Sequence, residues 1–215
     1  MRLWAELSAV PEDFVLYGGT ALAMHLGHRQ SADFDFFARR NLSLHALETG
    51  IAFLAGATII QRETNTLTVI VERDGPVKVS FFGLPELGRL EPPLLVKANG
   101  LQIASLLDLA GTKASVVQAR AEAKDYIDMD AMMRLGKVDL PTALAAGRAL
   151  YGPSFNPEIT LKALTYFGDG NLNELPDDLR SRLITAVRAV DLDHLPYIGQ
   201  TRIPSPPDED HGLEP

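Results

Sequence analysis

The sequence predicts an α+β protein: a mixed β-sheet flanked by helices, followed by a helical C-terminal part. Short β-rich runs dominate the first half of the chain, and helical periodicity with capping signals dominates the second half. We therefore expect an α/β core over residues 1–103 and a helical part over residues 104–202 that completes the site. We also expect an acidic, Pro-rich tail over residues 203–215 to be disordered.

The strands follow from short apolar or β-branched runs. After residue 33, acidic and aromatic residues alternate, which is typical of a strand with one polar face. An Asp-Gly pair at residues 74–75 predicts a hairpin turn, and residues 83–100 are expected to form an irregular connection. The predicted strands cover residues 14–17, 33–37, 58–62, 67–72 and 77–82.

The helices of the first half are predicted from their ends. Strong helix formers over residues 20–27 stop at Gly27, which suits the residue after a helix. Ser43 is a suitable N-cap for a second helix, with apolar residues from Leu44 to Leu54 on one side.

The helices of the second half carry similar signals. Ser105 and Asp108 have capping-box spacing before a helix that runs to about Ala119. A second helix is predicted over residues 125–135, ending at Gly136. Proline favours the first turn of a helix, and three more helices are predicted to begin near Pro141, Pro157 and Pro176.

The composition is that of a globular and mildly acidic protein. The chain has 215 residues, of which 46% are hydrophobic, and a net charge of −8. Four acidic residues fall within residues 203–215, so the rest of the chain lacks the basic surface of a general nucleic-acid binder. One nucleic-acid substrate held by a local patch remains compatible with this charge.

The sequence also excludes several classes of chemistry. The absence of cysteine excludes disulfides, thiol nucleophiles and Cys-ligated zinc. The N-terminus has no apolar run of signal-peptide length, and no stretch has the length of a membrane span. We expect a cytoplasmic protein with no membrane partner.

Gly18, Gly19 and Thr20 lie between a predicted strand and a predicted helix. Glycine lets the backbone approach a ligand closely, and a helix N-terminus offers free N–H groups to phosphate. The Thr20 hydroxyl would add one more donor. A plain strand-to-helix turn with Thr20 as N-cap is the alternative interpretation.

Asp33 and Asp35 share one face of a predicted strand, and Phe34 and Phe36 then point into the core. Two acids on one face repel each other unless a cation lies between them. Mg²⁺ takes one or two carboxylates together with phosphate oxygens. A solvated polar face on an edge strand is the alternative, but the glycine turn upstream favours the metal.

Residues 28–31 connect these two elements. Arg29 is placed to reach a phosphate, and Ser31 to fix the turn into the strand that carries the acids. His28 and Gln30 are expected to belong to an ordinary polar loop.

Lys113 places a charge within an apolar helical stripe, and Arg120 follows on the same stripe one heptad later. A buried lysine is unfavourable unless it is paired or binds an anion. Two cations that face inward suit a triphosphate or acidic side chains across the site. Snorkelling is the alternative, and it explains Arg120 near the helix end better than Lys113.

Asp125 shares a helix side with Met129 and Met132. An acid at a helix start is favourable on its own account, because it complements the helix dipole. The inward position and the nearby cations favour a carboxylate that is paired across the active site.

The motif GGTALAMHLGHRQSADFDFF resembles the first motif of the AbiEii/AbiGii-type nucleotidyltransferase toxins, a family within the DNA polymerase β-like nucleotidyltransferase superfamily. The later residues Lys113, Arg120 and Lys124-Asp125-Tyr126-Ile127-Asp128 resemble the family's K…R…(R/K)DxxD block. The resemblance covers roughly residues 14–135.

The resemblance implies a nucleotidyltransferase-like fold and a Mg²⁺- or Mn²⁺-dependent enzyme that transfers an NMP group from an NTP. The implied acceptors include tRNA ends, and the implied partner is a cognate antitoxin. The enzyme would be the toxin of a bacterial toxin–antitoxin or abortive-infection system. By position, Asp33 and Asp35 would bind the metal.

The remaining roles complete the expected site. Lys113 and Asp125 join the two metal-binding acids as catalytic residues. Asp125 would orient Lys113 or activate the acceptor hydroxyl. The residues expected to bind the NTP are Gly18, Gly19, Thr20, Arg29, Ser31 and Arg120.

The chain departs from the superfamily pattern at one position. A third carboxylate is expected on a later strand beside the acid pair, and Ser80 stands there. A two-metal site needs more carboxylate than one pair supplies. Either Asp125 acts as the base, or one metal suffices, or activity is lost. The alternative function is therefore a catalytically silent nucleotide-binding partner protein.

Overall fold

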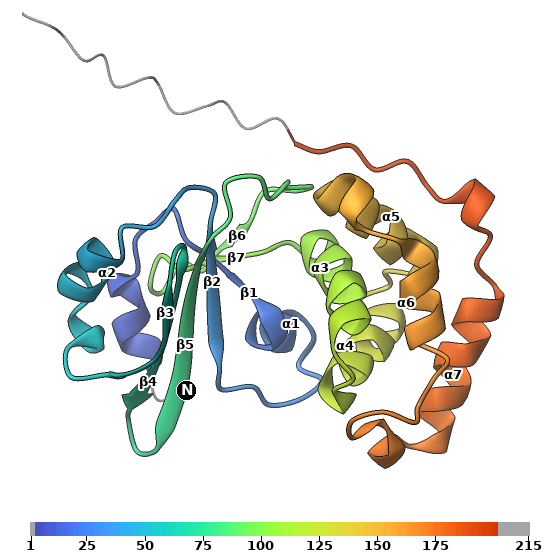
Figure 1. The fold of residues 1–215 in the computed structure, drawn as a ribbon, viewed down its shortest axis with the longest axis horizontal. Coiled ribbons are helices and arrows are strands. Elements are labelled where there is room, and N and C mark those ends of the chain that lie inside the picture. The colour runs from blue at the N-terminus through green and yellow to red at the C-terminus, as the bar shows by residue number, and fades with distance from the viewer. Residues whose placement is uncertain (1–2, 202–215) are drawn as a thin grey trace, which may run out of the picture.

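Figure 1 shows the computed structural model, which describes residues 3–201 as a seven-stranded mixed sheet beside a layer of helices. The strand order is β3-β4-β5-β2-β1-β7-β6. Strand β2 pairs parallel to β5, and β1 pairs parallel to β7, whereas the other neighbours are antiparallel. The predicted α+β class with a mixed sheet is confirmed.

The strands occupy the predicted runs, with two additions. Residues 83–100 were expected to be irregular, but they contain the two-residue strand β6, which pairs with β7. The strands are β1 (Val15–Tyr17), β2 (Phe34–Ala38), β3 (Thr58–Glu63), β4 (Thr66–Glu72), β5 (Pro76–Gly83), β6 (Leu94–Leu95) and β7 (Gln102–Ile103).

The helices also begin close to their predicted caps. The main difference is α2, which ends at Gly50 and gives way to a short 3₁₀ helix before Ala55. The α-helices are α1 (Gly18–Leu26), α2 (Leu44–Gly50), α3 (Leu106–Ala119), α4 (Ala123–Arg134), α5 (Leu140–Tyr151), α6 (Pro157–Ala163) and α7 (Asp177–Arg188). The 3₁₀ helices are η1 (Trp4–Ala9), η2 (Ala52–Leu54), η3 (Gly152–Ser154), η4 (Leu172–Glu174) and η5 (Leu192–His194).

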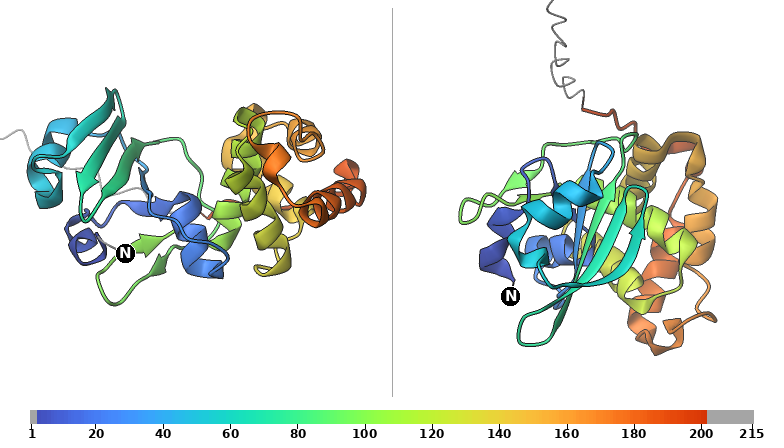
Figure 2. Two further views of the ribbon diagram at one scale, coloured as in Figure 1. Left: turned by 90° about the horizontal axis from the view of Figure 1, so that it is seen from below. Right: turned by 60° about the vertical axis from the view of Figure 1, so that its left-hand side comes forward.

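The two faces of the sheet have different neighbours. Helix α2 lies on one side of the sheet, and α1 and the helices from α3 onward lie on the other (Figures 1 and 2). Phe34, Phe36 and Phe81 are buried in the main core, whereas Asp35 and Phe37 alternate with them along β2 and point the opposite way. The strand periodicity therefore sends the acids toward the helical part.

The start of α3 ties the helical part to the sheet. The Ser105 side chain accepts a hydrogen bond from Asp108 N at 3.0 Å, as the predicted cap requires. The Asp108 carboxylate is buried and accepts from Leu90 N at 3.0 Å and Glu91 N at 3.1 Å. It also accepts from the Ser105 hydroxyl at 2.5 Å. The connection between β5 and β6 is thereby attached to α3.

The expected division at residue 103 falls between the end of β7 at Ile103 and the start of α3 at Leu106. Helix α1 contacts both the sheet and the helices α3 and α4. Residues 203–215, predicted to be a disordered tail, lie outside the described residues. Within residues 3–201, no helix has the length and apolar character to cross a membrane.

Candidate functional site

A cleft of about 730 Å³ opens between the acid-bearing face of the sheet and α3. Its size is in the range of small-molecule sites. The predicted site residues that line the cleft are Gly18, Gly19, Arg29, Ser31, Asp33, Asp35, Lys113 and Arg120. Thr20 and Asp125 do not line it.

Strand register arranges the sheet side of the cleft in three rows. The first row pairs Asp33, just before β2, with Lys78 on β5. The second joins Thr68, Ser80 and Asp35 across β4, β5 and β2. The third row places two aromatic rings next to each other on β2 and β5, where residue 37 pairs with residue 82. The cleft therefore changes from charged to polar to aromatic along the strands.

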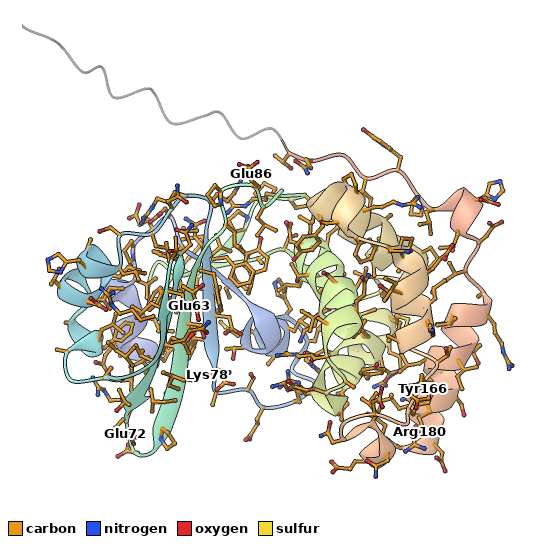
Figure 3. All side chains as sticks on the ribbon, in the orientation of Figure 1. Glu63, Glu72, Lys78, Glu86, Tyr166 and Arg180 are labelled. Atoms are coloured by element: carbon orange, nitrogen blue, oxygen red, sulfur yellow. The ribbon has the colours of Figure 1, made fainter. Side chains whose placement is uncertain are left out.

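Asp33 and Asp35 have different environments. Asp33 Oδ2 lies 3.2 Å from Lys78 Nζ, and both side chains are well exposed; Figure 3 labels Lys78 on β5. Burial raises the pKa of Asp35, and the charge of Lys78 and a hydrogen bond from Ser80 only partly offset this effect. The alternative placed these acids on an edge strand, and that placement is wrong, because β2 lies inside the sheet between β5 and β1.

The donor set around Asp35 lacks a third acid. Ser80 is the register partner of Asp35 on the parallel strand β5. Among residues 3–201, no group of three or more His, Cys, Asp or Glu side chains is placed to hold a metal. Two carboxylates together with substrate phosphate oxygens are nevertheless a usual ligand set for one Mg²⁺. Asp33 and Asp35 therefore fit one such ion.

The glycine pair forms the N-terminus of α1. The helix begins at Gly18, which has a φ of +72°, and the N-cap residue Tyr17 provides no side-chain cap. The first N–H groups of a helix lack partners within it, so they are available to an anion. A Cβ on Gly18 would lie 2.5 Å from Asp35 Oδ2, and one on Gly19 would overlap the Arg29 guanidinium. The glycines thus let Asp35 and Arg29 approach the helix N-terminus.

Thr20 has a different place from the one expected. Its side chain is buried, and its hydroxyl donates to the main-chain carbonyl of Asp33. The Thr20 hydroxyl oxygen also lies 2.9 Å from the Ser31 hydroxyl oxygen. Because α1 begins at Gly18, Thr20 is not the N-cap. Because Thr20 is buried and does not line the cleft, its hydroxyl is not a donor to the cleft. It holds the loop that carries Asp33.

Lys113 is buried within a group of charged side chains behind the cleft. Its Nζ lies 2.6 Å from Asp125 Oδ1 and 2.7 Å from Asp128 Oδ2, and its side chain is 6% exposed. Snorkelling therefore does not describe this lysine. The ammonium has three N–H donors, so these two carboxylates leave one donor for the cleft that Lys113 lines.

Asp125 connects Lys113 to Arg120. Arg120 donates from Nε to Asp125 Oδ2 at 2.8 Å and from Nη2 to Oδ1 at 3.2 Å. Burial disfavours the charged carboxylate, but the hydrogen bonds and the two cations outweigh it and lower the pKa of Asp125. A fully buried carboxylate with a lowered pKa is a poor base, so this geometry favours the orienting role over activation of a hydroxyl.

Asp128 was quoted in the sequence motif without a role, and it has the most extensive contacts. Arg29 donates to it through Nε at 2.7 Å and Nη2 at 2.9 Å, and His28 Nε2 lies 2.7 Å away. Burial opposes ionisation, but these hydrogen bonds and the charge of Lys113 hold the pKa of Asp128 well below its usual value. Its spacing from Asp125, i and i+3 on one helix face, was the available signal.

His28 was expected to belong to an ordinary polar loop, and this expectation is wrong. Its side chain is 3% exposed and bonded to Asp128 on α4. The contact joins residues one hundred positions apart, which no local pattern indicates. Gln30, from the same loop, lines the cleft.

Positive charge predominates in the cleft. Among residues 3–201, the cationic residues in its lining are Arg29, Lys78, Lys113, Arg120 and Lys124, and the acidic ones are Asp33 and Asp35. Asp125 and Asp128, which lie behind the lining, orient three of these cations. A helix N-terminus and fixed cations on one side, with an acid pair on the other, suit a polyphosphate that carries a divalent cation.

Comparison with known proteins identifies the family of this chain. The sequence model of the family described as "Nucleotidyl transferase AbiEii toxin, Type IV TA system" matches residues 2–201. An uncharacterised protein of Aquifex aeolicus is 32% identical over 169 residues, which cover 78% of this chain and 79% of the relative.

Two solved structures share the fold. MenT4, a nucleotidyltransferase toxin of Mycobacterium tuberculosis, is similar with a TM-score of 0.56 and 17% identity, over 89% of this chain and 82% of its own. A protein from H. pylori described as a putative nucleotidyltransferase gives a TM-score of 0.52 and 18% identity, over 87% and 90% of the two chains.

Proposed function

This chain belongs to the AbiEii nucleotidyl transferase toxin family, and from that premise we propose that it transfers an NMP group from an NTP to an acceptor hydroxyl. The cleft that joins a free helix N-terminus, an acid pair and a buried lysine is the observation that carries the proposal. In the reaction, the acceptor oxygen bonds to the α-phosphorus and the bond to the β-phosphate oxygen breaks. The acceptor proton passes to solvent, and pyrophosphate leaves with the electron pair of the broken bond.

The residues of the helical side would bind the phosphates. Gly18 and Gly19 line the cleft at the start of α1, where the N–H groups have no partners within the helix. Lys113 and Arg29 are held in position by buried carboxylates. Fixed charges of this kind stabilise the charge that develops on the leaving pyrophosphate without reorganisation at the moment of reaction. Arg120 and Ser31 line the same part of the cleft.

The acid pair would hold the divalent cation. Asp33 and Asp35 fit one Mg²⁺ or Mn²⁺ with two carboxylate ligands, and this ion would screen the phosphate charges. In the free protein, Lys78 neutralises Asp33. The metal would replace that ammonium as the counter-charge and release Lys78 toward the substrate.

The biological setting is part of the same proposal. Membership of a toxin family supports a toxin with a cognate antitoxin protein as partner. We propose a tRNA end as one acceptor class. The cleft cations would contact only a short part of such an acceptor. Induced expression in bacteria should therefore arrest growth, and Lys113→Met should relieve the arrest at an equal protein level.

Labelled transfer tests the reaction directly. The protein is incubated with each α-labelled NTP, Mg²⁺ or Mn²⁺, and total cellular RNA and protein. We expect label in one acceptor fraction, none from a γ-labelled NTP, and none with Asp33→Ala plus Asp35→Ala. The proposal fails if the double variant transfers label as the wild type does.

A silent nucleotide-binding partner protein is the second candidate, and Ser80 is the observation that favours it. This protein would bind NTP with Mg²⁺ but label no acceptor. The variant Ser80→Asp separates the two, since it adds the third carboxylate next to Asp35. Transfer by Ser80→Asp together with none by the wild type would support the silent protein. Transfer by the wild type excludes it.

A further inference from the structure

Two aromatic rings at one end of the cleft have no part in holding phosphate or metal. Phe37 on β2 and Phe82 on β5 are register partners that line the cleft and are partly exposed. They lie two residues along their strands from Asp35 and Ser80, which corresponds to about 7 Å. The acid pair and the rings therefore belong to one continuous surface.

The rings of Phe37 and Phe82 meet at a corner, and Tyr17 packs against Phe37. Tyr17 stacks on Phe37 with ring centres 4.6 Å apart and planes 13° apart. Phe82 is nearly perpendicular to Phe37, with centres 5.3 Å apart and planes 82° apart. Tyr17 is buried, lines the same cleft and covers one face of the Phe37 ring. A flat ligand can stack on one ring of such a corner and present its edge to the other.

Core packing accounts for only part of this arrangement. Phe37 packs against the main hydrophobic core, but among the described residues Phe82 lies outside that cluster. Phe82 packs edge-to-face with Phe37 but is only partly buried, so part of its ring faces the cleft. Every nucleobase has a flat π-face, and stacking on an aromatic side chain does not require a particular base.

We propose that Phe37 and Phe82, supported by Tyr17, form the platform on which a nucleobase stacks. This inference rests on the proposed function, because it divides the same cleft into a phosphate end and a base end. A nucleotide with its triphosphate at Gly18, Gly19 and Lys113 would extend its base along the strands toward these rings. Recognition by stacking predicts that the protein accepts more than one NTP.

Binding measurements with two probes test the platform. The affinities of Mg·NTP and Mg·tripolyphosphate, which has no base, are measured by calorimetry for the wild type, Phe37→Leu and Phe82→Leu. Base stacking on an aromatic ring is worth about 1–3 kcal/mol, so the Kd for the NTP should rise roughly 5- to 150-fold. The Kd for tripolyphosphate should not change.

Two controls separate loss of stacking from loss of folding. Tyr166→Leu removes an exposed ring on the helical side, outside the cleft (Figure 3), and should change neither Kd. Thermal unfolding confirms that each variant is folded. The platform is overturned if the Phe→Leu changes weaken the binding of both probes equally. It is also overturned if they weaken the binding of neither probe and of no short oligonucleotide. A wild type that binds no NTP instead defeats the proposed function.

A second titration identifies the source of the base. A short single-stranded oligonucleotide with a free 3′-hydroxyl replaces the NTP. If Phe82→Leu weakens oligonucleotide binding and leaves NTP binding unchanged, the stacked base belongs to the acceptor. If the loss is confined to the NTP, the base belongs to the donor nucleotide.

Discussion

Lys113 and Asp128 form a buried ion pair of 2.7 Å between Nζ and Oδ2, although they lie on different helices. Asp128 also holds His28 and Arg29, so it joins α4 to the loop between α1 and β2. This carboxylate therefore sets the positions of two cations that line the cleft.

The first prediction concerns Asp128→Asn. The change leaves Lys113 and Arg29 without their shared counter-charge, and breaking a buried ion pair costs about 3–5 kcal/mol. We expect the free energy of unfolding to fall by this amount, together with loss of NTP binding. Urea unfolding and calorimetry measure the two effects.

Asp130→Asn is the matched control for this prediction. Asp130 is also buried on α4 and holds Arg134 and Arg182, but it lies outside the cleft. The Asp130→Asn variant should be less stable than the wild type but should retain NTP binding at 10 °C. Equal loss of binding in both variants would show that folding alone explains the effect of Asp128→Asn.

The second prediction concerns Lys113→Met. After this change Asp125 still has Arg120, and Asp128 still has Arg29 and His28. The loss of stability should therefore be smaller than for Asp128→Asn, whereas label transfer should fall by at least about 100-fold, the range of one preorganised donor. The ratio of kcat/KM values measures this loss. Transfer at more than one tenth of the wild-type rate would contradict the prediction.

The third prediction concerns acid stability. The pKa values of Asp125, Asp128 and Asp130 are lowered in the folded protein, so these carboxylates bind protons more readily after unfolding. Their stabilisation is complete above the unfolded pKa near 4 and is lost as pH falls through that value toward the folded pKa. The urea midpoint should fall steeply below about pH 5, and less steeply in Asp128→Asn. A midpoint unchanged between pH 6 and pH 3 would contradict this.

The fourth prediction concerns Asp35→Asn. Burial raises the pKa of Asp35, so its ionised form costs stability above the unfolded pKa near 4, and the cost is largest at neutral pH. The amide removes that cost. We expect a higher urea midpoint at pH 7, an advantage that disappears at pH 3, and no label transfer. A lower midpoint at pH 7 would show that ionised Asp35 stabilises the fold.

The sequence predicted those parts of the site that depend on local pattern. The glycine turn, the acid pair and the inward direction of Lys113 follow from strand and helix periodicity. The roles of His28 and Asp128 were missed, because their pairing depends on a tertiary contact across one hundred residues. The hydroxyl of Thr20 was assigned to a ligand because a sequence motif does not show that the residue is buried beneath the loop.

The attachment at Asp108 has a mechanical consequence. Lys113 and Asp108 belong to the same helix, and Asp108 holds the main chain that leads away from β5, which carries Lys78 and Ser80. Moving one wall of the cleft away from the other would separate this buried carboxylate from its two main-chain donors, Leu90 N and Glu91 N. The contact opposes separation of α3 from the connection that follows β5, so we expect substrate binding to require little movement between the two walls of the cleft.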